Sequence, residues 1–371
     1  MKKIFRFAIL AGLILMTAGG RAEAQPPTFS DGDYIYTILE DGTAEIEKYT
    51  GESETMLIPD TIDGYPVAAI GETAFLNRSD LVSVTIPETV KTIGNDAFFG
   101  CSGLTSITIP DSVEKIGNSA FADCSGLTSV TIPDNVKYLG EFVFDSCRGL
   151  TAVTFGNGCT EIPDFSFCDC RELTSIVFPE NVRTIGVRAF WHCSSLTSVT
   201  IPDGVVSIGT EAFGDCENLA CVTFPDSAAS VGASPFTSCG ALEEIIISAD
   251  HPYLTLQDGI LFSKADQRLI CCTAIFAGEV YTVPDGIREI GERAFWGCGT
   301  VTSVTMPDSM TTIGEEAFGY CTGLRFVRIP AGVTEIGVNA FYACPKKMSV
   351  TVERGSFAEK YCKKNKLKRK Y

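Results

Sequence analysis

One phrase returns along most of this chain at a fixed step of 23 residues, and this repeat constrains the fold more than any other feature. The phrase ends in Ile-Pro or a close variant, and three early copies begin at Ile86, Ile109 and Ile132. A second phrase, Ile-Gly-x-x-Ala-Phe-x-x-Cys, recurs at the same step between them. A repeat of this length is typical of a solenoid, in which each coil buries its apolar face only against its neighbours. The sequence therefore predicts one long stack of coils.

The second phrase puts a phenylalanine and a cysteine at constant positions in the coil. The phenylalanine occurs eleven times, at Phe75, Phe98, Phe121, Phe144, Phe167, Phe190, Phe213, Phe236, Phe295, Phe318 and Phe341. Ten of these coils have a cysteine three residues later, and Arg78 takes that position in the first coil. A buried Phe contributes about 1.5–3 kcal/mol, so we expect this column to be scaffold. The prediction is an α/β-type solenoid of about eleven coils, mostly β-strand with short helical or 3-10 turns.

Each coil also contains the apolar spacing of a short strand. In Leu127-x-x-Val130-x-Ile132 three apolar side chains should point inward, and this is the leucine-rich-repeat template. The two phrases, an interruption after Ile247 and the ending Gly-Ser-Phe-Ala-Glu-Lys-Tyr resemble the BspA-like class of leucine-rich repeats over roughly residues 33–367. The resemblance implies a bacterial protein that is exported or displayed at the surface. It also implies an association with adhesion to host proteins and other cells.

The 23-residue step breaks once, because Val283 follows Ile247 by 36 residues. Asp258-Gly259 lies between apolar runs there and predicts a β-hairpin that projects from, or replaces, one coil. Near the end, Ser356 and Glu359 form a capping box that should open a helix through about Leu367. The predicted segments are a signal peptide (1–24), an N-terminal β-hairpin cap (25–64), leucine-rich repeats (65–247), a hairpin insertion (248–282), further repeats (283–352) and a C-terminal capping helix with a basic tail (353–371).

The first residues have the features of an export signal. Lys2 and Lys3 precede an apolar run, and Ala22-Glu23-Ala24 fits a cleavage site before Gln25. We therefore expect a secreted or cell-surface bacterial protein with no transmembrane segment in the mature chain. The formal net charge of -17 disfavours nucleic acid as a partner. We expect the basic residues 363–370 to form a frayed, solvated end, and contact with an anionic envelope polymer or the acidic body is the alternative.

Sixteen cysteines in an exported chain allow two interpretations. Ten share one repeat position and should form an inward column, where small free thiols fill the space well. Neighbouring coils lie about 4.8 Å apart, so disulfides between coils stay open as an alternative. The six cysteines outside the column are the better disulfide candidates: Cys159, Cys168, Cys221, Cys271, Cys272 and Cys362.

The sequence shows no constellation typical of catalysis, cofactor binding or metal binding. Zinc-type Cys spacing is absent, and the only two histidines, His192 and His251, lie far apart. We therefore predict that the protein is not an enzyme and needs no cofactor.

The most informative positions for binding are those that vary between otherwise regular coils. The residue after the repeated Phe varies freely, and the next position also carries aromatic rings. Large aromatic side chains facing outward are good contact anchors, although they could instead fill gaps on the convex face. The predicted ligand contacts are Phe99, Trp191, His192, Trp296, Tyr320 and Tyr342.

These expectations combine into one functional hypothesis. We predict a monomeric exported binding protein whose partner is a protein or glycan on a host or bacterial surface. The alternative is a structural or assembly component of the bacterial envelope without a host ligand.

Overall fold

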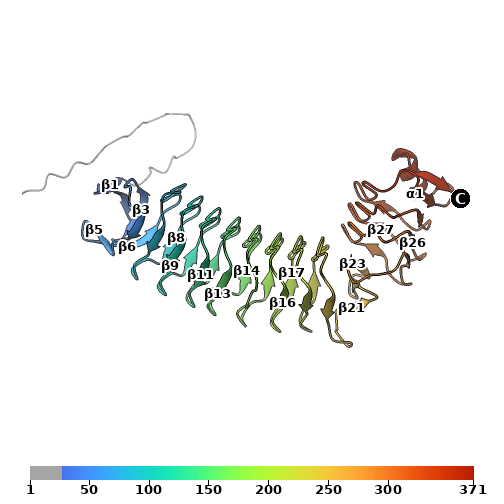
Figure 1. Ribbon diagram of the computed structural model, residues 1–371, viewed down its shortest axis with the longest axis horizontal. Coiled ribbons are helices and arrows are strands. Elements are labelled where there is room, and N and C mark those ends of the chain that lie inside the picture. The colour runs from blue at the N-terminus through green and yellow to red at the C-terminus, as the bar shows by residue number, and fades with distance from the viewer. Residues whose placement is uncertain (1–26) are drawn as a thin grey trace, which may run out of the picture.

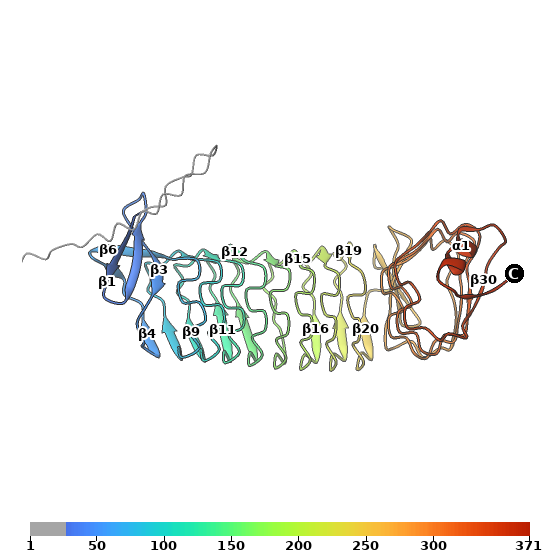
Figure 2. The same ribbon diagram turned by 90° about the horizontal axis from the view of Figure 1, so that it is seen from above.

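The computed structural model describes residues 27–371, so the predicted signal peptide lies outside the described residues. These residues form a β-solenoid of about 14 turns with almost no helix (Figure 1). Two parallel ladders run along it. One contains strands such as β7 (Ser83–Thr85) and β9 (Ser106–Thr108), and the other contains shorter strands such as β8 (Thr92–Ile93) and β10 (Lys115–Ile116). Figure 2 shows the two ladders along opposite edges of the solenoid.

The solenoid has more turns than the eleven coils predicted from the repeated Phe. The additional turns lack that residue and were therefore missed. One begins with β20 (Glu244–Ile246) and runs into the interruption of the repeat. The others contain β30 (Ser349–Thr351) and β31 (Lys368–Lys370), which extend the ladder of β28 (Phe326–Arg328) at the C-terminal end.

Both ends of the stack are covered by other elements. At the N-terminal end, β1 (Thr28–Asp31), β2 (Tyr34–Ile38) and β3 (Ala44–Tyr49) pair antiparallel, and β3 joins the parallel ladder through β6 (Tyr65–Ile70). At the other end lies α1 (Phe357–Lys364), which stops before the predicted end near Leu367. Half of the predicted capping box forms, because Ser356 Oγ accepts from the Glu359 N–H at 3.1 Å, whereas the Glu359 carboxylate accepts from the Gly355 N–H at 2.9 Å and not from that of Ser356.

The expectation of a frayed basic end is wrong. Lys368, Arg369 and Lys370 form β31, which pairs in parallel with β30. The Val352 N–H donates to the Lys370 carbonyl at 3.0 Å, and the Tyr371 hydroxyl donates to Glu359 at 2.8 Å. Backbone pairing therefore holds the end of the chain on the stack.

The segment that carries the repeated Phe is a series of β-turns, and the prediction of a helical or 3-10 turn is wrong. In the first coil the Phe75 N–H donates to the Ala97 carbonyl of the next coil at 2.8 Å. The Leu76 N–H donates three residues back, to Thr73, at 3.1 Å. Because alternate N–H groups bond to the next coil, they cannot continue a helix. Thr73 and Asn77 also have positive φ, which interrupts helical geometry.

The repeated Phe and Cys residues form buried columns. The rings of Phe98 and Phe121 stack with centroids 5.3 Å apart and an interplanar angle of 8°. The Cys124 thiol lies 3.2 Å from the Phe98 carbonyl oxygen, and the same bond recurs in most coils. All sixteen cysteines fall within residues 27–371 and are free, so none of the disulfide alternatives forms in this structure. In these coils the position suits a small apolar side chain with one hydrogen-bond donor, and cysteine supplies both.

The repeated glycine of the second phrase is required by a close approach between coils. A Cβ on Gly117 would lie 2.7 Å from the Gly94 carbonyl carbon of the preceding coil. One coil has Pro163 at this position, and proline has no N–H to donate. The short ladder is interrupted there, between β12 (Tyr138–Leu139) and β14 (Glu161–Ile162).

A second interruption divides the solenoid into an N-terminal stack (residues 44–246) and a C-terminal stack (residues 260–370). The ladders of the first end at β19 (Ser230–Val231) and β20, and the sheet of the second begins with β21 (Leu254–Gln257), β22 (Ile260–Ser263) and β23 (Arg268–Cys272). Figure 1 shows the stacking direction turning sharply at this point, which we call the elbow. In Figure 2 the C-terminal coils are accordingly seen nearly along their axis.

The hairpin of β22 and β23 opens the C-terminal stack, where it is buried against the N-terminal stack and does not project. All four residues of β22 are buried. Leu261 and Ile270 belong to the core of the N-terminal stack, whereas Ile260, Phe262 and Leu269 belong to the core of the C-terminal stack. One strand pair thus contributes to two cores, and the direction of stacking changes across it.

Candidate functional site

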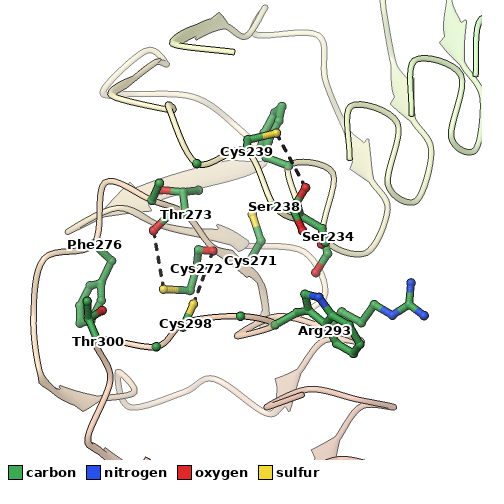
Figure 3. A pocket seen from close by; sticks show the side chains of 17 residues that line it. Ser234, Ser238, Cys239, Cys271, Cys272, Thr273, Phe276, Arg293, Cys298 and Thr300 are labelled. Atoms are coloured by element: carbon green, nitrogen blue, oxygen red, sulfur yellow. Dashed lines mark hydrogen bonds between the residues drawn. The ribbon is translucent and has the colours of Figure 1, made fainter. Parts of the chain in front are cut away.

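The elbow brings distant coils together around a pocket of about 360 Å³, which we call the elbow pocket. Its walls come from the Phe-bearing turns of both stacks, so these turns face one another on the inner side of the bend. The N-terminal stack contributes Arg188, Trp191, Glu211 and Asp215, and the C-terminal stack contributes Arg293 and Trp296. An adjoining cavity of about 230 Å³ is bordered by Cys239, Cys271, Cys272 and Cys298 (Figure 3).

The two walls carry the same sequence motif. Arg-Ala-Phe-Trp occurs at 188–191 and again at 293–296, and each copy is followed one coil later by Glu-Ala-Phe-Gly, at 211–214 and 316–319. Each indole lies over the glycine of the next coil, because a Cβ on Gly214 would clash with the Trp191 ring and one on Gly319 with the Trp296 ring. Both tryptophans are half-buried in consequence. Their rings are held in place by the repeat itself.

A chain of four charged side chains runs across the elbow. Arg188 pairs with Glu211 at 2.5 Å, Glu211 pairs with Arg293 of the other stack, and Arg293 pairs with Glu316 at 2.7 Å. The Glu211 side chain is only 3% exposed. Burial would lower the pKa of Arg293, but its hydrogen bonds to Glu316 and Glu211 raise it overall, so the guanidinium stays charged.

Side chains also provide the other polar contacts between the stacks. Ser234 Oγ donates to the Glu292 carbonyl at 3.0 Å, and Arg268 donates to the Val231 carbonyl at 2.8 Å. No strand pairing connects β19 or β20 to the C-terminal sheets within the described residues. Thr237 borders both cavities, and its buried hydroxyl has no hydrogen-bond partner in residues 27–371.

The structure places two of the predicted contact residues in the elbow pocket and two more beside it. Trp191 and Trp296 line the elbow pocket from opposite stacks. Tyr320 packs edge-to-face on Trp296 with centroids 4.8 Å apart, and Tyr342 packs in the same way on Tyr320 at 5.4 Å. The tyrosine side chains are 44% and 48% exposed. These rings form an exposed aromatic ridge that leads away from the pocket along the C-terminal stack.

The remaining predicted contacts lie elsewhere. His192 is half-buried, and its Nδ1 lies 3.0 Å from Asp169, which also pairs with Arg148 and Arg171. Burial opposes ionisation of Asp169, but hydrogen bonds from the two arginines lower its pKa overall. Phe99 is half-buried in an early coil and borders neither cavity at the elbow. His192 therefore belongs to a neighbouring charged cluster, and Phe99 lies away from both cavities.

The sequence analysis missed the charged part of the site. Arg188, Glu211 and Arg293 all occupy the position two residues before the repeated Phe, which also varies between coils. The same comparison at that position would have revealed the duplicated Arg and Glu pairs. It would not have revealed that the two copies meet.

Residues 27–371 contain neither a metal-binding cluster nor a membrane-spanning helix. No group of three or more His, Cys, Asp or Glu side chains is arranged there to hold a metal ion. The one α-helix of this part of the chain has eight residues, so none of its helices is long and apolar enough to cross a membrane.

Comparisons with known proteins agree with this architecture. The profile of the BspA type leucine rich repeat region matches in six copies, over residues 68–197, 183–257 and 279–366. A leucine rich cell surface protein of Faecalibacterium prausnitzii A2-165 is 30% identical, with a TM-score of 0.64 and 89% of each chain covered.

Two further solved structures are similar over parts or all of the chain. A leucine rich repeat protein of T. pallidum is 29% identical with a TM-score of 0.44, covering 57% of this chain and 88% of its own. One from Bacteroides ovatus ATCC 8483 is 23% identical with a TM-score of 0.45, covering 92% and 99%. A search of curated proteins found no match.

Proposed function

The chain belongs to the BspA-type leucine-rich-repeat proteins, and from this membership we propose that it is an exported binding protein that contacts a protein or glycan on a host or bacterial surface. Proteins of this family are associated with protein–protein interaction and adhesion. The relative from Faecalibacterium prausnitzii is itself a cell surface protein. Export through the predicted signal peptide, with a mature chain beginning at Gln25, is part of the proposal.

The elbow pocket is the observation that carries this proposal. The scaffold positions repeat in nearly every coil and carry no information about a partner. By contrast, Trp191 and Trp296 lie together at a concave junction beside arginine and carboxylate groups. Pockets at the junction of two structural units, with aromatic walls and a few polar groups, are where proteins most often bind ligands. Trp and Arg are also the residues most enriched among strong interface contacts.

The runner-up is a structural component of the bacterial envelope, and the basic C-terminal end favours it. Lys363, Lys364 and Lys366 are exposed at and just beyond the end of α1, and Lys368 and Lys370 are exposed on β31. They form a cationic end on a chain of net charge -17. Such a surface could contact an anionic polymer of the envelope.

A binding assay under flow separates the two functions. Purified protein is passed over immobilised host matrix proteins, mucin, whole bacteria and envelope fractions of the producing species. The proposal expects binding to a host or foreign-cell surface, and a fall in this binding when Trp191 and Trp296 are both changed to alanine would assign the contact to the elbow pocket. Phe99→Ala is the matched control, because Phe99 is an aromatic residue at the same repeat position in another coil. Binding to envelope fractions alone would support the runner-up and contradict an adhesive role.

A further inference from the structure

We propose that the elbow pocket binds a neutral saccharide unit, and this inference rests on the binding function proposed above. The chain has only two tryptophans, and both line this pocket from opposite stacks. The face of an indole ring is electron-rich, so it attracts the partly positive C–H groups on the face of a sugar ring. The Arg293 guanidinium lies over the Trp296 ring, 5.1 Å from its centroid, so Trp191 offers the stacking face and Trp296 with Arg293 forms the opposite wall. Because each indole is held over a glycine of the next coil, little side-chain entropy is lost when a ligand packs on it.

The arrangement of charge argues against an ionic ligand. A cation would meet two arginines, and both carboxylate oxygens of Glu211 are already paired, one with Arg188 and one with Arg293. Asp215 is the one carboxylate of the pocket lining left unpaired among the described residues, and the two arginines outnumber it. An anion would approach a chain with a formal net charge of -17, and the two arginines are already paired with carboxylates. The positive and negative side chains of the pocket therefore balance one another, and this polar lining suits an uncharged polar ligand.

Hydrogen-bonding groups remain free to meet the hydroxyls of such a ligand. Within residues 27–371, Nη1 of Arg188 and Nη2 of Arg293 make no hydrogen bond or ion pair to the protein. The Asp215 carboxylate on the pocket wall likewise makes no side-chain hydrogen bond or ion pair within residues 27–371. Guanidinium N–H groups only donate and a carboxylate only accepts. A sugar hydroxyl both donates and accepts, so it can satisfy either kind of group.

The size of the site fits this class of ligand. The elbow pocket encloses about 360 Å³, near the lower end of the roughly 300–1,000 Å³ typical of small-molecule sites. The aromatic ridge of Tyr320 and Tyr342 begins at Trp296 and is open to solvent. A chain of sugars seated in the pocket could continue along this ridge. We therefore infer an oligosaccharide with one unit held at the elbow.

Tryptophan fluorescence provides a direct test, because every tryptophan of the chain lies at the site. The folded protein is titrated with two neutral probes, lacto-N-neotetraose and maltotetraose, and with anionic 3′-sialyllactose and a cationic glucosamine tetramer. The inference expects a saturable change in emission with at least one neutral probe and none with the charged probes. Saturation by a charged probe alone, or by no probe, overturns it.

Variants establish whether the probe binds at the elbow. Calorimetric titration should show at least a tenfold loss of affinity for Trp191→Ala and for Trp296→Ala, and no change for Phe99→Ala. Asp215→Asn is the second variant, because asparagine tolerates the positive φ of this position and should leave the fold intact. It should weaken binding several-fold. The inference is overturned if Asp215→Asn, Trp191→Ala and Trp296→Ala all bind the probe with the affinity of the unchanged protein.

The cell-binding assay distinguishes failure of this inference from failure of the proposed function. If the double tryptophan variant binds host or bacterial surfaces as well as the unchanged protein does, the saccharide site is refuted and the binding function stands. If the unchanged protein binds no surface, the proposed function itself fails. Thermal melting of each variant shows whether a lost signal reflects a lost fold.

Discussion

Glu211 joins the two stacks of this solenoid, because its carboxylate pairs with Arg188 in its own stack and with Arg293 in the other. The two partners of Glu211 in space are separated along the chain by more than a hundred residues. Each stack has its own hydrophobic core, and strand pairing stops at the elbow. The angle between the stacks, and hence the shape of the elbow pocket, depends on this carboxylate and on the buried hairpin.

Changing Glu211 to glutamine should weaken the elbow. The substitution leaves Arg188 and Arg293 without their shared counter-charge. The cost should be below the roughly 3–5 kcal/mol of a fully buried pair, because these arginine side chains are 37% and 27% exposed and Arg293 keeps its pair with Glu316. Because a solenoid is stabilised by neighbouring contacts only, the two stacks should then unfold separately. Circular dichroism during urea unfolding should show two transitions for the variant and one for the unchanged protein. Glu315→Gln is the control, since Glu315 is exposed in a neighbouring coil. A transition identical to that of the unchanged protein would contradict the role given to Glu211.

The regular part of the fold could be predicted from the sequence because it depends on contacts between adjacent coils. Phe98 stacks on Phe121, the residue 23 positions later, so the repeat in the sequence is also the repeat in space. The turn conformation could not be predicted in the same way. Ala-Phe is compatible with a helix, and only the bonds from alternate N–H groups to the next coil favour β-turns.

The candidate site could be predicted only in part, for a different physical reason. Trp191 and Trp296 stand out because they break the repeat, but their meeting depends on a bend that no local pattern specifies. The run Ile260-Leu261-Phe262 is continuously apolar, which is typical of a strand buried on both faces. This pattern favours a strand buried between two cores over the projecting hairpin that was one of the two predicted forms. It gave no angle between the stacks.

The buried cysteines should react slowly with thiol reagents in the native protein. Burial raises the pKa of Cys239 to about 12 and that of Cys159 to about 11, and it also raises the pKa of Cys147 and Cys193. The thiolate is the reactive form, so little of it exists at pH 8. Mass spectrometry after brief alkylation should find these residues unmodified, and all sixteen modified in guanidinium. Rapid native modification of Cys193 would show that its coil opens readily.

Acid should loosen the C-terminal end before the main stack. Hydrogen bonds from Lys363, the Gly355 N–H and Tyr371 lower the pKa of Glu359 to about 2. Since this pKa is below the ordinary glutamate value of 4.5, ionised Glu359 stabilises the fold above that value, and the contribution is lost as the pH falls toward 2. Hydrogen exchange in α1 should therefore accelerate, relative to the stack, between pH 5 and pH 2. In Glu359→Gln the hydrogen exchange in α1 should already be fast at pH 7. Its rate relative to the stack should then change little between pH 5 and pH 2. An unchanged pH profile in the variant would assign the effect to other groups.

The left-handed positions of the turns predict a stabilising substitution. Ala343 is exposed and has a φ of 55°, a conformation that costs an L-residue roughly 1–2 kcal/mol. Glycine adopts it without this cost but loses more entropy on folding, so Ala343→Gly should stabilise the protein by up to about 1 kcal/mol. Ala340→Gly in the same coil is the opposite control, because Ala340 is fully buried, lacks positive φ and should be destabilised by glycine. Thermal melting should therefore shift upward for the first variant and downward for the second. Downward shifts in both would show that the energetic cost of the turn lies elsewhere than in its backbone conformation.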